Sequence, residues 1–114
     1  MNIKRGDIFL AALDPAMGRE ISKTRPVVVV SNDKNNEFSG TVTILPITSK
    51  NTQAVYPFEV FLPLGHANLP KDSKIKADQI RTLDKNRLIK QLGVLDNKHM
   101  DAVDMAMKIH LALP

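Results

Sequence analysis

The sequence contains no cysteine and no tryptophan, and its only histidines are His66, His99 and His110. Without cysteine there is no thiol nucleophile, no cysteine-ligated zinc, no iron–sulfur cluster and no disulfide framework. This absence fits a reducing compartment. The three histidines are scattered along the sequence, so we predict no metal site and no cofactor.

Long apolar runs are also absent, since none approaches the roughly 20 residues that a membrane span needs. Residues 1–7 include the charged Lys4, Arg5 and Asp7 and precede no long apolar segment. We therefore expect a soluble, cytoplasmic protein with no membrane contact. The chain has 114 residues, of which 43% are apolar and 25% charged, and these values favour one folded domain over residues 1–114.

The net charge of +4 is concentrated in residues 71–90, which carry seven bases and three acids. The rest of the chain carries nine bases and nine acids. A basic stretch in an otherwise balanced protein suggests an anionic partner, most often a nucleic acid. The alternative is a solvated loop and helix face with no partner.

Short apolar segments separated by turn signals predict a mainly β protein. We expect strands at 7–13, 25–30, 40–48, 56–62 and 74–80, a helical turn at 84–87, and a strand or extended link at 88–95. Pro46 predicts an edge strand or a bulge. Asp96 is a candidate N-cap for a helix that extends to about Leu113. The expected fold class is mainly β, or α+β: a small antiparallel sheet curled over a core and closed by a C-terminal helix.

Polar residues that could carry chemistry gather at three places near strand ends. The first place precedes the strand at 25–30, the second follows the strand at 40–48, and the third lies on and after the strand at 74–80. Their members are Arg19, Glu20, Lys23 and Arg25; Thr48, Ser49 and Lys50; and Lys74, Lys76, Asp78, Gln79 and Arg81. Lys74, Lys76 and Asp78 are expected to share one strand face. If the three strands are neighbours in the sheet, the three places converge.

RNA cleavage requires none of the missing groups, because the substrate supplies its own nucleophile, the 2′-hydroxyl. The protein must remove that proton, stabilise charge on the phosphoryl oxygens and protonate the leaving 5′-oxygen. Arginine suits the second role, since its guanidinium binds phosphate in a bidentate manner and stays protonated. Each of these roles has a candidate among the polar residues above.

Several short motifs occur in order along nearly the whole chain. They are Lys4-Arg5-Gly6-Asp7-Ile8, Leu13-Asp14-Pro15, Gly18-Arg19-Glu20, Arg25-Pro26-Val27-Val28-Val29, Pro46-Ile47-Thr48 and Asp78-Gln79-Ile80-Arg81-Thr82-Leu83-Asp84. Together they resemble the motifs of the MazF/PemK (Kid) toxins of bacterial toxin–antitoxin systems. The resemblance implies an SH3-like small barrel that forms a homodimer.

The resemblance also implies an endoribonuclease that acts independently of ribosomes and metals. It would cut single-stranded RNA at short sequences and leave a 2′,3′-cyclic phosphate and a 5′-hydroxyl. The implied partner is a cognate antitoxin, whose acidic C-terminal tail would lie along the basic groove and block RNA entry.

The family pattern places Arg25 and Thr48 at the two positions most closely tied to catalysis, with Glu20 and Asp78 at acidic positions. Because an arginine stays protonated and is a poor general base, we assign Arg25 to charge stabilisation on the phosphoryl group and leave the general base open between Glu20 and Asp78. The residues expected to contact RNA are Arg19, Lys23, Ser49, Lys50, Lys76, Gln79 and Arg81. Two positions depart from the family pattern. Arg19 stands where other members often have Ser or His, and Lys76 stands where some members use Arg.

Purely structural roles are the alternatives for these residues. Arg25 could pair with Glu20, Thr48 could cap a turn, and Asp78 could sit between Lys76 and Arg81 as a structural carboxylate.

Two other functions fit the same fold. A gyrase-poisoning toxin would act through a C-terminal Trp-Gly-Ile, whereas this chain ends Leu111-Ala112-Leu113-Pro114. A barrel that binds RNA without cutting it would stack bases on aromatic side chains, and aromatic residues make up only 4% of the chain.

Overall fold

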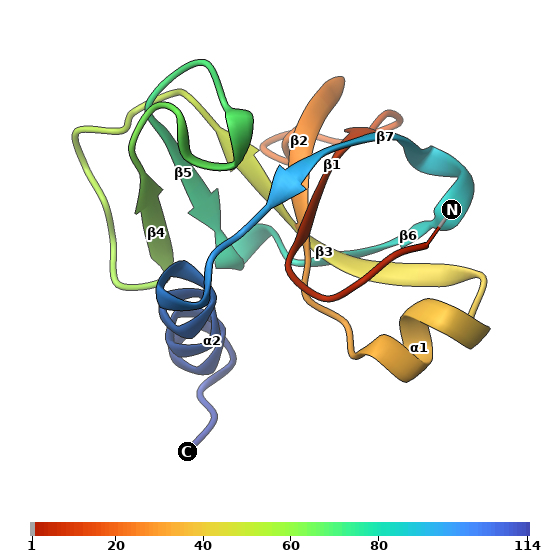
Figure 1. The fold of residues 1–114 in the computed structure, drawn as a ribbon. Helices are drawn as coiled ribbons and strands as arrows, with labels where there is room; N and C mark the ends of the chain where they lie inside the picture. The colour runs from red at the N-terminus through yellow and green to blue at the C-terminus, as the bar shows by residue number, and fades with distance from the viewer. Residues whose placement is uncertain (1) are drawn as a thin grey trace.

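Residues 2–114, which the computed structural model describes, form a curled antiparallel sheet with a helix at the C-terminus (Figure 1). The strands are β1 (Asp7–Ala12), β2 (Thr24–Val29), β3 (Thr41–Thr48), β4 (Glu59–Leu62), β5 (Ser73–Lys76), β6 (Arg81–Asp84) and β7 (Leu88–Val94). The helices are α1 (Asp33–Phe38) and α2 (Asn97–Leu111), and the 3₁₀ turns are η1 (His66–Asn68), η2 (Ala77–Gln79) and η3 (Lys85–Arg87). The predicted fold class is confirmed.

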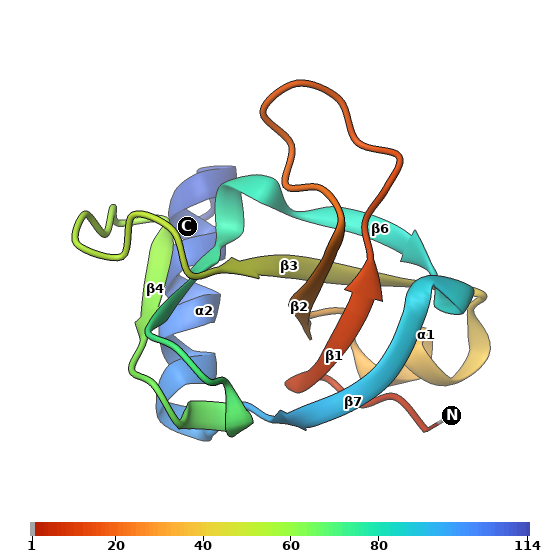
Figure 2. The same cartoon turned by 90° about the horizontal axis from the view of Figure 1, so that it is seen from above.

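β3 is the central strand of the sheet, whose order is β4-β5-β3-β2-β1-β7. One side of β3 pairs with β2. Its other side pairs with β6 over residues 41–44 and then with β5 over residues 47–48. β3 therefore crosses the molecule between two groups of elements, with β4 and α2 at one end and α1 and β6 at the other (Figure 2).

The position of Pro46 corrects one expectation, because β3 is not an edge strand. Pro46 faces Val27 of β2. On its other side the partner of β3 changes, since pairing with β6 ends at Ile44 and pairing with β5 begins at Ile47. Proline lacks a backbone N–H, so an interruption in the strand pairing is a place that tolerates it.

Two apolar clusters fill the two sides of the curled sheet. Neighbouring residues on β1 and β2 alternate between them: Ile8 and Val28 belong to the cluster that includes α2, whereas Phe9 and Val27 belong to the other. Because both faces of these strands are covered, the run of four valines at 27–30 is buried throughout. The strands that carry the polar sites are thus fixed from both sides.

Helix α2 follows the prediction from sequence closely. The Asp96 side chain caps it by accepting a hydrogen bond from the His99 backbone N–H, and Ala112 ends it in the left-handed conformation. Met100, Val103 and Ala106 are its buried residues. Within residues 2–114, no helix has both the length and the apolar character that crossing a membrane requires.

Several predicted boundaries were wrong. The strand expected at 74–80 ends at Lys76, because Ala77 turns into the buried core and begins η2, so Asp78 does not share a strand face with Lys74 and Lys76. The strand expected at 56–62 begins only at Glu59. Helix α1 and strand β6 were not predicted, since each is too short, at six and four residues, to show a clear apolar period.

Candidate active site

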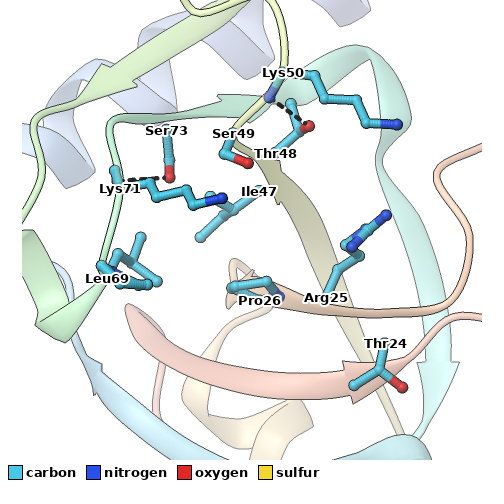
Figure 3. A pocket seen from close by; sticks show the side chains of 11 residues that line it. Thr24, Arg25, Pro26, Ile47, Thr48, Ser49, Lys50, Leu69, Lys71 and Ser73 are labelled. Carbon is cyan, nitrogen blue, oxygen red and sulfur yellow. Dashed lines mark hydrogen bonds between the residues drawn. The ribbon is translucent and has the colours of Figure 1, made fainter.

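Strands β2, β3 and β5 are neighbours, and they bring the first two predicted polar places together. Arg25 lies on β2 and Thr48 at the end of β3, and both line a cavity of about 200 Å³ (Figure 3). Ser49 and Lys50 continue its rim, and Lys71 borders it from the segment before β5. The convergence expected from the strand order therefore occurs.

The side chains of Arg25 and Thr48 are available to a ligand. Among residues 2–114, the Arg25 guanidinium makes neither an ion pair nor a hydrogen bond, so the alternative pairing with Glu20 does not occur. The Thr48 hydroxyl accepts a hydrogen bond from the Lys50 backbone N–H at 3.1 Å, as a turn cap would, but it keeps its own proton to donate. A free cation beside a free hydroxyl donor is suited to the oxygens of a phosphate.

Two further hollows lie beside this cavity. One hollow of about 220 Å³ is lined by Arg19, Glu20, Arg25, Thr48 and Lys50. A larger one of about 520 Å³ shares Arg19, Thr48 and Lys50 with it and adds other residues, among them Lys74, Lys76, Asp78 and Gln79.

A fourth hollow, beside Glu20, Asp78 and Gln79, includes Arg81. The connected surface thus gathers every predicted site residue except Lys23. Lys23 is exposed at the base of the β1–β2 loop, with its backbone held by Asp14.

The β1–β2 loop, which extends from the sheet in Figure 2, carries Arg19 and Glu20 and is fastened by Gln79. The Gln79 amide accepts from the Ile21 N–H at 3.1 Å and donates to the Arg19 carbonyl at 3.2 Å. The Glu20 carboxylate accepts from the Met17 N–H at 2.6 Å. Gln79 was predicted to contact RNA, and its observed contacts give it the role of positioning the loop.

Glu59 was missed by the sequence analysis, and it organises the charges on β4 and β5. Its carboxylate is buried and forms ion pairs with the Lys74 ammonium at 3.1 Å and the Lys76 ammonium at 2.6 Å. Lys76 also lies 3.7 Å from Asp78. The signal in the sequence was a glutamate next to apolar residues, whereas its position opposite Lys76 is known only from the strand register. We call Glu59, Lys74, Lys76 and Asp78 the Glu59 network.

The electrostatics of the network follow from these contacts. Burial alone would raise the pKa of Glu59, but hydrogen bonds from Lys76, the Tyr56 N–H and Lys74 outweigh it and lower the pKa below its ordinary value. The carboxylate is therefore held ionised, and it forms ion pairs with both lysines inside the fold.

Residues 71–90 do not form the single basic surface that their composition suggested. Four of the seven bases are engaged inside the protein: Lys74 and Lys76 bind Glu59, Arg81 donates to the Leu13 carbonyl, and Arg87 donates to the Ala12 carbonyl. The cations without an ion pair around Thr48 are Arg19, Arg25, Lys50 and Lys71, as judged over residues 2–114, and they come from separate segments of the chain. Of these, only Lys71 belongs to the basic stretch.

A curled antiparallel sheet that presents free cations around a hydroxyl defines a small β protein whose surface is suited to an anionic ligand. A family model described as the PemK-like, MazF-like toxin of type II toxin–antitoxin systems matches residues 4–111. This chain belongs to that family.

Individual relatives cover nearly the same span. The chain is 43% identical over 111 residues to the endoribonuclease MazF of Staphylococcus saprophyticus, covering 97% of this chain and 92% of that one. It is 42% identical over 113 residues to the endoribonuclease EndoA of Bacillus subtilis, covering 99% and 97%. The crystal structure of MazF from Deinococcus radiodurans superposes with a TM-score of 0.85 at 27% identity and covers 99% of both chains.

Proposed function

We propose that this chain, acting as a single domain over residues 1–114, is a sequence-specific, ribosome-independent endoribonuclease and the toxin of a toxin–antitoxin pair. The observation that carries the proposal is the Arg25 guanidinium, which has no partner within residues 2–114 and borders one cavity with the Thr48 hydroxyl. Relatives named endoribonucleases, at 42 and 43% identity, support the choice of RNA as substrate.

The proposed reaction is attack of the RNA 2′-hydroxyl on the adjacent phosphorus, which leaves a 2′,3′-cyclic phosphate and a 5′-hydroxyl. Arg25 and the Thr48 hydroxyl would stabilise the charge that builds on the phosphoryl oxygens. Glu20 is the better placed of the two candidate bases, because it shares one hollow with Arg25 and Thr48, whereas Asp78 is paired with Lys76. No step in this scheme requires a metal ion.

The test is incubation of the purified protein with a long single-stranded RNA in EDTA, followed by mapping of the ends. We expect discrete fragments with 5′-hydroxyl ends at a recurring short sequence. Arg25→Ala and Thr48→Val should suppress cleavage while the circular dichroism spectrum stays unchanged. Intact RNA with correctly folded wild-type protein would refute the function, and a fully active double variant would refute the site.

The proposed partner is an antitoxin with an acidic segment whose carboxylates would occupy the phosphate positions beside Arg25, Lys50 and Lys71. Solved structures of the same fold include a MazE–MazF assembly from Deinococcus radiodurans, at 27% identity and a TM-score of 0.79. An acidic antitoxin peptide should compete with RNA, and its affinity should fall when Arg25 is replaced. Binding that is indifferent to Arg25 and to salt would contradict this placement.

We also propose that the protein is a cytoplasmic homodimer. Exposed apolar side chains on the edge strand β7, Ile89 at 52% and Val94 at 60%, support self-association. Sedimentation should give twice the mass of the chain, and a monomer at micromolar concentration would exclude a stable dimer.

A further inference from the structure

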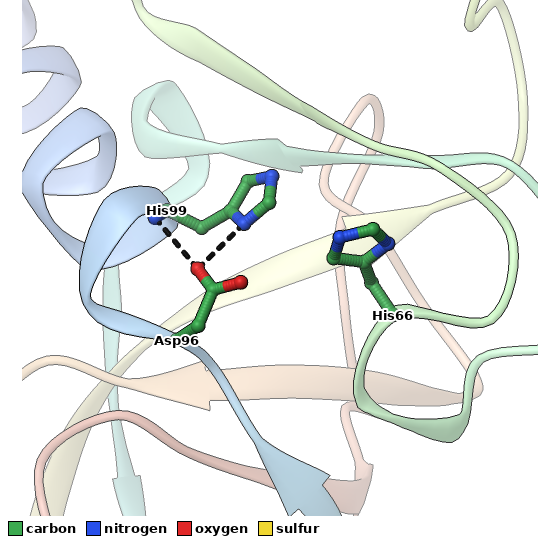
Figure 4. A group of neighbouring side chains, drawn as sticks. All are labelled: His66, Asp96 and His99. Atoms are coloured by element: carbon green, nitrogen blue, oxygen red, sulfur yellow. Dashed lines mark hydrogen bonds and ion pairs between the residues drawn. The ribbon is translucent and has the colours of Figure 1, made fainter.

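Two histidines that are distant in the sequence meet at the start of α2. His66 lies on η1, His99 lies in the first turn of α2, and Asp96 caps that helix (Figure 4). One ligand atom from each of the three residues lies within 4.8 Å of the others. The sequence analysis predicted no metal site because the histidines are far apart along the chain, but folding brings two of them together. The cluster contributes no residue to the hollows around Thr48.

The position of His66 is fixed by the contact between η1 and β7. The Asn68 side chain donates to the Leu92 carbonyl at 2.8 Å. A Cβ on Gly93 would lie 2.8 Å from the Ala67 carbonyl oxygen, so the turn packs closer to the strand than any other residue type would allow. Because β7 leads directly into Asp96, these contacts hold His66 in place against the other two ligands.

Two imidazoles and a carboxylate are a ligand set that zinc prefers. Zinc sites with three protein ligands commonly use histidine with Asp or Glu and keep a further position for water. Mg²⁺ favours oxygen ligands in octahedral geometry and would gain little from two imidazoles. We propose that His66, Asp96 and His99 bind one Zn²⁺.

Hydrogen bonding within the protein accounts for only part of this arrangement. Asp96 accepts from the His99 N–H at 2.9 Å and contacts its Nδ1 at 2.7 Å. His66 is held by neither bond, and its ring meets the His99 ring edge-on with centroids 4.9 Å apart. His66 therefore supplies the third ligand that a hydrogen-bonded Asp–His pair does not need.

The ion would join the 63–70 loop to the beginning of α2. Leu69, three residues after His66, is buried and lines the cavity that holds Arg25. Bound zinc would thus fix one wall of that cavity from outside, without entering it. This role is independent of whether the cavity cleaves RNA.

The test is titration of the metal-free protein with Zn²⁺ by calorimetry and by thermal unfolding. We expect one ion per chain and a rise in Tm of roughly 10 °C at a zinc concentration a hundredfold above Kd. His66→Ala and Asp96→Asn should each weaken binding at least about tenfold. Asp96→Asn is informative because asparagine preserves the helix cap while removing the carboxylate.

His110→Ala is the matched control, since His110 is exposed and lies outside the cluster. It should leave zinc affinity unchanged, and Mg²⁺ should produce no shift in Tm. NMR should show zinc-dependent changes in the imidazole signals of His66 and His99 but not of His110. Zinc binding that survives both cluster variants, or that His110→Ala weakens equally, would overturn the proposal.

Discussion

Cations from around Thr48 and cations of the Glu59 network border the same hollow but lie in opposite electrostatic surroundings. Arg25 and Lys50 have no ion-pair partner within residues 2–114, whereas Lys74 and Lys76 share the buried carboxylate of Glu59. A free cation can bind an anionic ligand. A cation paired in a buried site is committed to the fold, because removing its partner leaves an uncompensated buried charge.

The difference shows that residue type and local charge density do not separate free cations from paired ones. Lys74 is paired with Thr48 in the strand register and is nevertheless committed to Glu59. The deciding feature is whether a carboxylate lies within reach of the cation. Glu59 faces Lys76 directly across β4 and β5, and Lys74, which lies opposite Phe61, reaches Glu59 diagonally.

The largest expected effect comes from removing the shared carboxylate. Glu59→Ala should lower the free energy of unfolding by about 3–5 kcal/mol, because it leaves the buried Lys74 without a counter-charge and Lys76 with Asp78 alone. Urea unfolding measures this change. Glu37→Ala, at an exposed glutamate on α1, is the control and should change stability by less than about 0.5 kcal/mol. If both substitutions lowered the free energy of unfolding equally, the Glu59 network would have no special role in stability.

Arg25→Ala should show the reverse pattern. We expect cleavage to fall about 100- to 1,000-fold, as when one donor to a developing anionic charge is lost, with unfolding free energy unchanged within about 0.5 kcal/mol. Single-turnover cleavage of a defined RNA measures the first quantity and urea unfolding the second. Lys34→Ala, at an exposed cation on α1, should leave both unchanged. A large loss of stability in Arg25→Ala would show that Arg25 is committed to the fold, as Lys74 and Lys76 are.

Thr48→Val tests the hydroxyl with little change in shape. Loss of a hydrogen bond to a charged group should slow cleavage roughly 10- to 100-fold. Thr48→Ser should retain most of the rate, because it keeps the hydroxyl. Thr41→Val, at the exposed opposite end of β3, should cleave at the wild-type rate. A fully active Thr48→Val would leave Thr48 with only its turn-capping contact to Lys50.

The smallest expected effect is on the pH dependence of stability. Because the pKa of Glu59 is lowered on folding, its contribution is present above the ordinary value of 4.5 and is lost as the pH falls below it. Burial raises the pKa of Asp7, so the contribution of Asp7 to stability changes with pH in the opposite direction. Urea unfolding between pH 7 and about pH 3 should show a shallower acid decline for Glu59→Gln than for the wild type. Parallel curves would argue against the lowered pKa.

The sequence predicted what depends on local pattern. The strand expected at 25–30 and the helix expected after Asp96 are both present, because a run of valines and an N-cap are local signals. The polar places at Arg25 and Thr48 were found because each adjoins a strand end, and their convergence required only that β2 and β3 be neighbours.

What the sequence did not predict depends on pairing between distant segments. Nothing local to Glu59 indicates that it faces Lys76, and nothing local to His66 indicates that it meets His99. Helix α1 is set by the Asn32 cap and by the buried Asn36, which donates to the Ser31 carbonyl, rather than by an apolar period. Side-chain hydrogen bonds of this kind leave little trace in hydropathy.

The change of partner along β3 also orders events during synthesis of the chain. The Thr48 end of β3 can pair with β5 only after β5 has been synthesised. The residues of 69–73 that line the cavity are synthesised just before or at the start of β5. At 5–20 residues per second, a ribosome needs about 1–6 s to add residues 49–76 after Thr48. The site is therefore completed late in translation, so the growing chain passes most of its synthesis without an assembled cavity.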